Sequence, residues 1–85
     1  SKVKFTCYPN PAAEVTTFQY SVLEKSEIKI LITDLTGKVI QNIEPSKHTE
    51  AELSISTDQL AQGVYACTLL VNGKAEKTIK LVIVR

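Results

Sequence analysis

The sequence predicts an all-β fold in which about seven strands form an antiparallel sandwich of two sheets. Hydrophobic and polar residues alternate with a period of two along most of the 85-residue chain, which is how side chains alternate between the two faces of a strand. Turn-forming residues interrupt this alternation roughly every 8–12 residues, and no stretch keeps a helical period beyond one turn. This combination is typical of an immunoglobulin-like sandwich.

Each expected strand is a stretch of alternating residues that ends at a turn. The stretches cover residues 2–7, 17–22, 28–32, 39–43, 51–56, 65–71 and 79–84, of which 39–43 is short. In the others, alternation places hydrophobic residues on one face, which we expect to form the core. These are Val3, Phe5 and Cys7; Phe18, Tyr20 and Val22; Ile28, Ile30 and Ile32; Ala51, Leu53 and Ile55; Tyr65, Cys67, Leu69 and Val71; and Ile79, Leu81 and Ile83.

The turns that follow the first and third strands have specific chemistry. Pro9, Asn10 and Pro11 end the first strand, because a proline has no backbone N–H to donate to a sheet. Asp34 and Gly37 occupy the first and last positions of a type I turn between the third and fourth strands.

Glycines also shape the last part of the chain. Asn72 and Gly73 predict a type I′ turn between the last two strands. Gly63 follows Leu60 at a tight corner, where we expect it to adopt a positive φ. Tyr65 then enters the next strand two residues before a cysteine, as the tyrosine at the corner of an immunoglobulin domain does.

The two cysteines leave two alternatives open. Cys7 and Cys67 can form a disulfide if the first and sixth strands face each other, although the chain has no Trp on which an immunoglobulin bridge would pack. Both can equally pack as small hydrophobic residues with free thiols. The cysteine count therefore does not fix the redox compartment.

Composition excludes several classes of function. The net charge of +1 gives no electrostatic basis for nucleic-acid binding, and the longest aliphatic run, Leu81–Val84, is far shorter than the ~20 residues of a transmembrane helix. The N-terminal residues have no signal-peptide pattern. The single histidine, His48, lies in a polar loop without the partners of a metal site, and the isolated glycines form no phosphate loop. We therefore predict no enzyme activity, catalytic residue, metal or cofactor.

The last strand is hydrophobic on both faces, because Val82 and Val84 alternate with Leu81 and Ile83. Either its own or a neighbouring domain covers both faces, or the strand is an exposed edge to which a receptor adds a strand. An exposed edge would also favour self-association. Residues 74–85 carry a net charge of +3 and residues 44–58 a net charge of −3, which indicates either two solvated faces or a basic hairpin that docks on an acidic receptor.

Taken in order, these motifs resemble the type A C-terminal sorting domain of the type IX (Por) secretion system of Bacteroidota. The resemblance extends over nearly the whole chain, and a related sandwich, the immunoglobulin-like domain of the flagellar hook-capping protein, resembles its first half. The motifs that carry it are Tyr8-Pro9-Asn10-Pro11-Ala12, Thr16–Val22, Asp34-Leu35-Thr36-Gly37-Lys38-Val39, Leu60-Ala61-Gln62-Gly63-Val64-Tyr65, Asn72-Gly73-Lys74 and Lys80-Leu81-Val82-Ile83-Val84-Arg85.

The resemblance implies a secretion signal that is not itself a catalyst. It implies that residues 1–85 are one sorting domain, the last domain of a larger secreted protein whose cargo part precedes it, and the start at Ser1 without a Met agrees with a fragment. Its partners would be the outer-membrane translocon and a cell-surface sortase. The protein would pass through the periplasm to the outer-membrane surface or the medium. Export would depend on the final segment, Lys80–Arg85. The alternative function is an immunoglobulin-like interaction or spacer module of a secreted multidomain protein.

Overall fold

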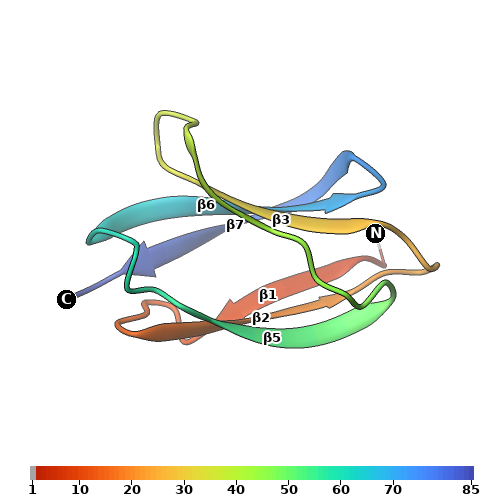
Figure 1. Cartoon of the computed structure of the whole chain (residues 1–85), viewed down its shortest axis with the longest axis horizontal. Coiled ribbons are helices and arrows are strands. Elements are labelled where there is room, and N and C mark those ends of the chain that lie inside the picture. Colours follow the sequence, from red (N-terminus) through yellow and green to blue (C-terminus); the bar gives the residue numbers. More distant parts are fainter. Residues whose placement is uncertain (1) are drawn as a thin grey trace.

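The computed structural model describes residues 2–85 and confirms an all-β sandwich of two sheets (Figure 1). Its strands are β1 Lys4–Tyr8, β2 Val15–Ser21, β3 Ile28–Thr33, β4 Val39–Ile43, β5 Glu50–Ser56, β6 Gly63–Val71 and β7 Lys74–Ile83. Sheet A has the order β1-β2-β5 and sheet B the order β4-β3-β6-β7, and all neighbouring strands pair antiparallel. Over residues 2–85 there is no helix, and hence none that could cross a membrane.

The largest difference from the predicted boundaries is in the last strand. β7 begins at Lys74 rather than near Ile79, because the tight turn at Asn72 and Gly73 lets Val71 pair with Lys74 at once. Both turn residues have positive φ, 52° and 81°, as a type I′ turn requires. Charged residues interrupt the hydrophobic alternation of this early part of β7, so the sequence pattern did not extend to it.

The predicted inward-facing residues form one core between the sheets. Phe18, Ile30 and Leu69 are completely buried, and the rings of Phe5 and Phe18 stack with their centroids 5.7 Å apart. Burying each such side chain contributes about 1.5–3 kcal/mol. The core comprises Phe5, Ala12, Phe18, Tyr20, Val22, Ile28, Ile30, Ile32, Leu60, Tyr65, Cys67, Leu69, Leu81 and Ile83, with several predicted residues, such as Cys7 and Leu53, packed against it.

Cys67 is buried in this core and Cys7 is half-buried beside it, and both thiols are free. The arrangement is the second of the two alternatives, in which the cysteines pack as small hydrophobic residues. Burial, and less strongly the neighbouring Cys7, raises the pKa of Cys67 to about 12. Burial also raises the pKa of Cys7. Both groups are therefore protonated at neutral pH.

The two ends of the described chain lie near opposite ends of the long axis, along which the sandwich measures 37 Å (Figure 1). The β6–β7 turn lies at the same end as the N-terminus. The C-terminus lies at the other end, together with the β1–β2 connection and the corner that precedes β6 (Figure 1). This placement brings distant parts of the sequence together around the last residues.

Candidate functional site: the end of the last strand

The outer edge of β7 is closed by a short segment of the β1–β2 connection, Asn10–Ala12. The Asn10 side chain donates from Nδ2 to the Lys80 carbonyl oxygen (2.6 Å) and accepts at Oδ1 from the Val82 N–H (3.0 Å). Ala12 continues the pairing, since its N–H donates to the Val82 carbonyl (2.8 Å) and its carbonyl accepts from the Val84 N–H (2.9 Å). The Lys80 carbonyl, both backbone groups of Val82 and the Val84 N–H are thus paired within the domain.

The expectation of an exposed edge at the last strand is therefore wrong for residues 80–84. β7 is the edge strand of sheet B, as the sequence suggested, but Asn10 and Ala12 take the place of a neighbouring strand there. Such a cover protects an edge from pairing with other chains. Self-association through this edge stays a prediction, and it would first require Asn10 and Ala12 to move away.

The neighbouring prolines explain why an asparagine is needed at this place. Pro9 and Pro11 have no N–H, so the side chain of Asn10 supplies the donor and acceptor that a strand backbone would otherwise offer. Both prolines follow cis peptide bonds. Thr16 Oγ1 donates to the Pro9 carbonyl (3.1 Å), which ties the connection to β2.

Arg85 fixes the end of the chain to two loops. Its guanidinium donates to the Thr57 carbonyl (2.6 Å) and also to the carbonyls of Ala13 and Leu60. Its backbone N–H donates to Gln62 Oε1 (3.2 Å). Hydrogen bonds from a charged donor are stronger than neutral ones, so Arg85 joins the last strand to both the β1–β2 connection and the corner before β6.

The corner before β6 has the arrangement predicted from Leu60, Gly63 and Tyr65. Leu60 and Tyr65 are buried, and Gly63 has a φ of 154°, a value open mainly to glycine. The Tyr65 hydroxyl donates to the Ala61 carbonyl (2.6 Å), which reproduces the tyrosine corner of immunoglobulin domains. Thr57 adds a bond from Oγ1 to the Ala13 carbonyl (3.0 Å).

The remaining predicted motif residues form turns outside this assembly. Asp34 Oδ1 accepts from the backbone N–H groups of Thr36 and Lys38 (2.9 and 3.0 Å), and Gly37 has a φ of 90°. The hydrogen bond from the Thr36 hydroxyl is the main cause that lowers the pKa of Asp34. The turn at Asn72 and Gly73 lies at the opposite end of the sandwich (Figure 1).

The predicted segment Lys80–Arg85 divides into buried and accessible side chains. Leu81 and Ile83 are 0% and 1% exposed and belong to the core, whereas Val84 is 42% exposed, Lys80 is exposed and Val82 is half-buried. A partner that meets the folded domain can therefore contact Lys80, Val82 and Val84, while the backbone edge beside them is occupied. The sequence alone does not show this division, because all four residues of Leu81–Val84 are hydrophobic.

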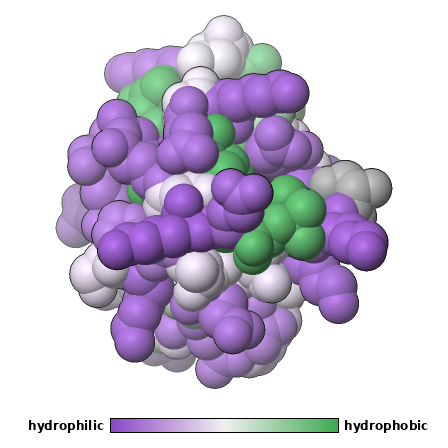
Figure 2. Space-filling view, turned by 90° about the vertical axis from the view of Figure 1, so that its right-hand side faces the viewer, coloured by the Kyte–Doolittle hydropathy of each residue, from purple (hydrophilic) through white to green (hydrophobic). Residues whose placement is uncertain are grey.

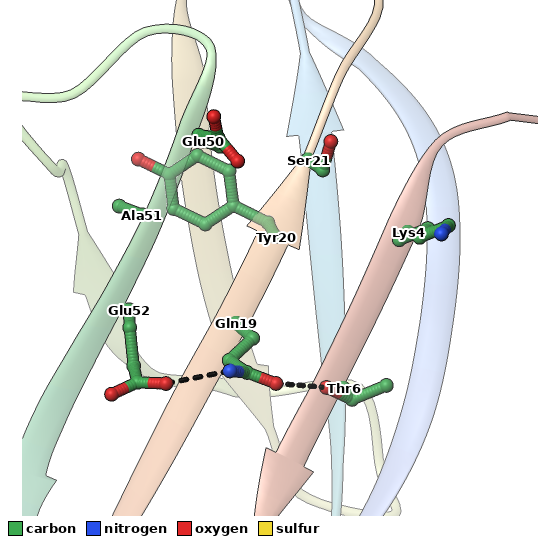
Figure 3. Close-up of a pocket in the computed structure, with 8 residues that line it drawn as sticks. All are labelled: Lys4, Thr6, Gln19, Tyr20, Ser21, Glu50, Ala51 and Glu52. Carbon is green, nitrogen blue, oxygen red and sulfur yellow. Dashed lines mark hydrogen bonds between the residues drawn. The ribbon is translucent and has the colours of Figure 1, made fainter.

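Away from this end, a hollow lies on the outer face of sheet A (Figure 3). It measures about 450 Å³ and is lined mostly by polar residues, and Glu52 accepts there from Gln19 Nε2 (2.5 Å) and from the Tyr8 hydroxyl (2.9 Å). The bond to Glu52 raises the pKa of Tyr8. These side chains satisfy one another, and the arrangement resembles the solvated face of a sheet more than a catalytic centre.

Within residues 2–85 no group of His, Cys, Asp and Glu side chains is placed to hold a metal ion. His48 is exposed, and its Nδ1 lies 2.8 Å from the Ser26 carbonyl, so it helps to fix the loop before β5. The end that carries the N-terminus and the β6–β7 turn is covered largely by hydrophilic side chains, with hydrophobic ones in small separate groups (Figure 2). The C-terminal end remains the place where the sequence motifs converge.

Comparison with known proteins agrees with this geometry. A protein-family model described as "Secretion system C-terminal sorting domain" matches residues 6–85. Among solved structures, the chain is similar to part of PorZ of Porphyromonas gingivalis, described as an essential bacterial surface component of the type-IX secretion system, with a TM-score of 0.66 and 24% identity. The match covers 95% of this chain and 11% of PorZ, so the likeness concerns one domain and its fold. No curated protein matches the chain.

Proposed function

The chain belongs to the family of secretion system C-terminal sorting domains, and we propose that the type IX machinery recognises it at the end of its last strand, Lys80–Arg85. Domains of this family sort the protein that carries them for type IX secretion, and their cargo reaches the cell surface or the extracellular space. The domain therefore acts as a signal. We further propose that the outer-membrane translocon and a surface sortase are its partners and that it catalyses no reaction itself.

The observation that carries this proposal is the convergence of three distant motifs on the last strand. Asn10 and Ala12 cover its outer edge, and Arg85 binds carbonyl groups of both the β1–β2 connection and the corner before β6. These contacts hold the final residues in one conformation with Lys80, Val82 and Val84 accessible. A fixed conformation lowers the entropy cost of binding, which suits a segment that another protein must recognise.

The positions of the two termini support a role as an adaptor between cargo and machinery. In our proposal, the cargo precedes this domain and is attached at the N-terminus, which lies toward the other end of the sandwich from the C-terminus (Figure 1). A bulky cargo there would leave the C-terminal end accessible. A sortase could likewise reach the junction with the cargo while the translocon holds the other end.

Deletion of Val82–Arg85 tests whether the last strand is the recognised element. The experiment fuses the domain to a reporter that is exported to the periplasm and measures the reporter at the surface and in the medium of type IX-competent cells. We expect the intact domain to deliver the reporter and the deletion to leave it in the periplasm. Export of the truncated fusion at the undiminished rate would contradict the proposal.

Because the deletion removes buried Ile83 together with the accessible residues, loss of folding must be separated from loss of recognition. A matched control, Leu69→Ala, creates a core cavity outside the last strand and should cost about 2–5 kcal/mol. A second variant, Val84→Ser, alters an exposed side chain only. If Val84→Ser reduces export with unchanged thermal stability, the signal lies in the segment; if only the destabilised variants fail, export requires the fold and not this segment.

A further inference from the structure

We propose that the outer face of sheet B, and not the last strand alone, is the surface that docks on the secretion machinery, and that the docking partner presents a hydrophobic patch flanked by carboxylates. This inference rests on the proposed function and extends the site from β7 to β6 and β3. The face is the side of sheet B that points away from sheet A. Its residues alternate with the buried ones along each strand.

The register of the strands defines this face. Val64 of β6 pairs directly with Val82 of β7, and Ala66 pairs with Lys80. On the other side of β6, Thr68 pairs with Leu31 of β3. The accessible part of the last strand therefore continues without interruption into its neighbours. The face comprises Lys29, Leu31 and Thr33 of β3, Val64, Ala66, Thr68 and Leu70 of β6, and Thr78, Lys80 and Val82 of β7, and β4 adds Asn42 and Val39, which pair with Leu31 and Thr33.

The chemistry of this face differs from that of the opposite one. Its only charges are the two lysines, Lys29 and Lys80, while aliphatic and threonine side chains occupy the positions between them. Val64 is 37% exposed near one end of this face and lies beside Val82 of β7. Among the residues of the face there is no carboxylate, so a partner that approaches it meets only positive charge.

The outer face of sheet A serves as an internal comparison. Hydroxyl and amide side chains dominate it, with Glu50 and Glu52 on β5 and Lys4 on β1 as its charges, and Val15 is its aliphatic residue. Its side chains bond to one another, as Gln19 and Glu52 do in Figure 3. The outer face of sheet A thus has polar side chains that hydrogen-bond to one another and is partly acidic, whereas the outer face of sheet B is apolar and basic. Charge complementarity assigns the apolar, basic face to an acidic partner.

Two variants outside the segment Lys80–Arg85 test the inference. Lys29→Glu reverses the charge on β3, and Val64→Thr replaces a methyl group by a hydroxyl while keeping a β-branched side chain suited to a strand. Each is expressed as the reporter fusion in type IX-competent cells, and folding of the purified domain is followed by circular dichroism. We expect each to slow delivery of the reporter about tenfold, which corresponds to a loss of about 1.4 kcal/mol in binding free energy.

The matched controls lie on the opposite face. Lys4→Glu and Val15→Thr make the same two changes on sheet A and should leave delivery unchanged. If the wild-type fusion is delivered and the folded sheet B variants are delivered as fast, the inference is overturned while the proposed function stands. If the wild-type fusion itself stays in the periplasm, the proposed function fails first. Equal losses on both faces would also overturn the inference.

Analytical sedimentation of the purified domain tests whether a second copy of this chain binds to the outer face of sheet B. We expect Val64→Thr to leave the sedimentation of the domain unchanged from that of the wild type. A wild-type dimer that Val64→Thr converts to a monomer would show that the face binds another copy, and would overturn the assignment to the secretion machinery.

Discussion

Replacement of Asn10 by alanine should loosen the end of the last strand while leaving the core intact. The substitution removes the hydrogen bonds from Asn10 to the Lys80 carbonyl and from the Val82 N–H to Asn10. Each such bond contributes about 0.5–1.5 kcal/mol net, and water can partly replace both because the side chain is exposed. We therefore expect a loss of about 1–2 kcal/mol in the free energy of unfolding. For a domain of this size, such a loss lowers Tm by roughly 4–16 °C.

Two measurements on the purified domain check this expectation. Thermal or urea unfolding gives the loss of stability, and amide hydrogen exchange followed by NMR gives its location. The N–H of Val82 should exchange faster in the variant, because Asn10 is its acceptor, whereas amides inside the β3–β6 pairing should follow global stability.

Asn42→Ala is the matched control, since Asn42 is exposed on β4, at the opposite edge of sheet B. The reasoning is refuted if Asn10→Ala costs no more than this control, or if exchange at Val82 does not change. Either result would mean that Asn10 does not hold the last strand in solution.

The remaining predictions concern the corner, the β3–β4 turn and the thiols. Tyr65→Phe removes the hydrogen bond to the Ala61 carbonyl and should lower the free energy of unfolding by about 1 kcal/mol. Tyr65→Ala should lower it by about 3–5 kcal/mol, since Tyr65 is only 8% exposed. A loss below ~1 kcal/mol for Tyr65→Ala would mean that the ring is not packed in solution. The pKa of Asp34 is lowered from the usual value of 3.8, so its ionised form stabilises the fold above pH 3.8, and this contribution is lost as the pH falls through the folded-state pKa. The difference in unfolding free energy between wild type and Asp34→Asn should therefore shrink below pH 3.8. Urea unfolding on both sides of that pH checks the sign. With a pKa of about 12, Cys67 should resist alkylation in the native protein at neutral pH and react after unfolding, and mass spectrometry with and without reductant should show two free thiols; rapid native labelling of Cys67 would contradict its burial.

Local patterns in the sequence predicted most of the fold because sandwich strands and tight turns have local signatures. Period-two alternation located the core-facing residues of β2, β3 and β6, and the asparagine-glycine pair located the last hairpin. Leu60, Gly63 and Tyr65 marked a corner whose tyrosine is bonded as predicted. The sequence thus revealed each motif that lies at the C-terminal end of the sandwich.

Their convergence on one strand could not be predicted from the same patterns. The contacts of Asn10 with β7 join residues 70 and 72 positions apart, and no local periodicity reports such a pairing. Pro9 and Pro11 indicated a strand end, and only the structure shows that the asparagine between them pairs with another strand. The sequence pattern indicated that Arg85 belongs to a basic C-terminal segment, yet its guanidinium donates to backbone carbonyls of the same domain. Of the two alternatives for the last strand, the exposed edge is therefore the wrong one for residues 80–84.

The most direct test of the central claim is delivery of a reporter by the domain itself. The fusion is expressed in two otherwise identical strains, one with an intact type IX translocon and one without it, and surface, medium and periplasmic reporter are measured. We predict surface or extracellular reporter in the first strain and periplasmic reporter in the second. A folded fusion that stays in the periplasm of both strains would contradict the claim and would favour a spacer or interaction module instead.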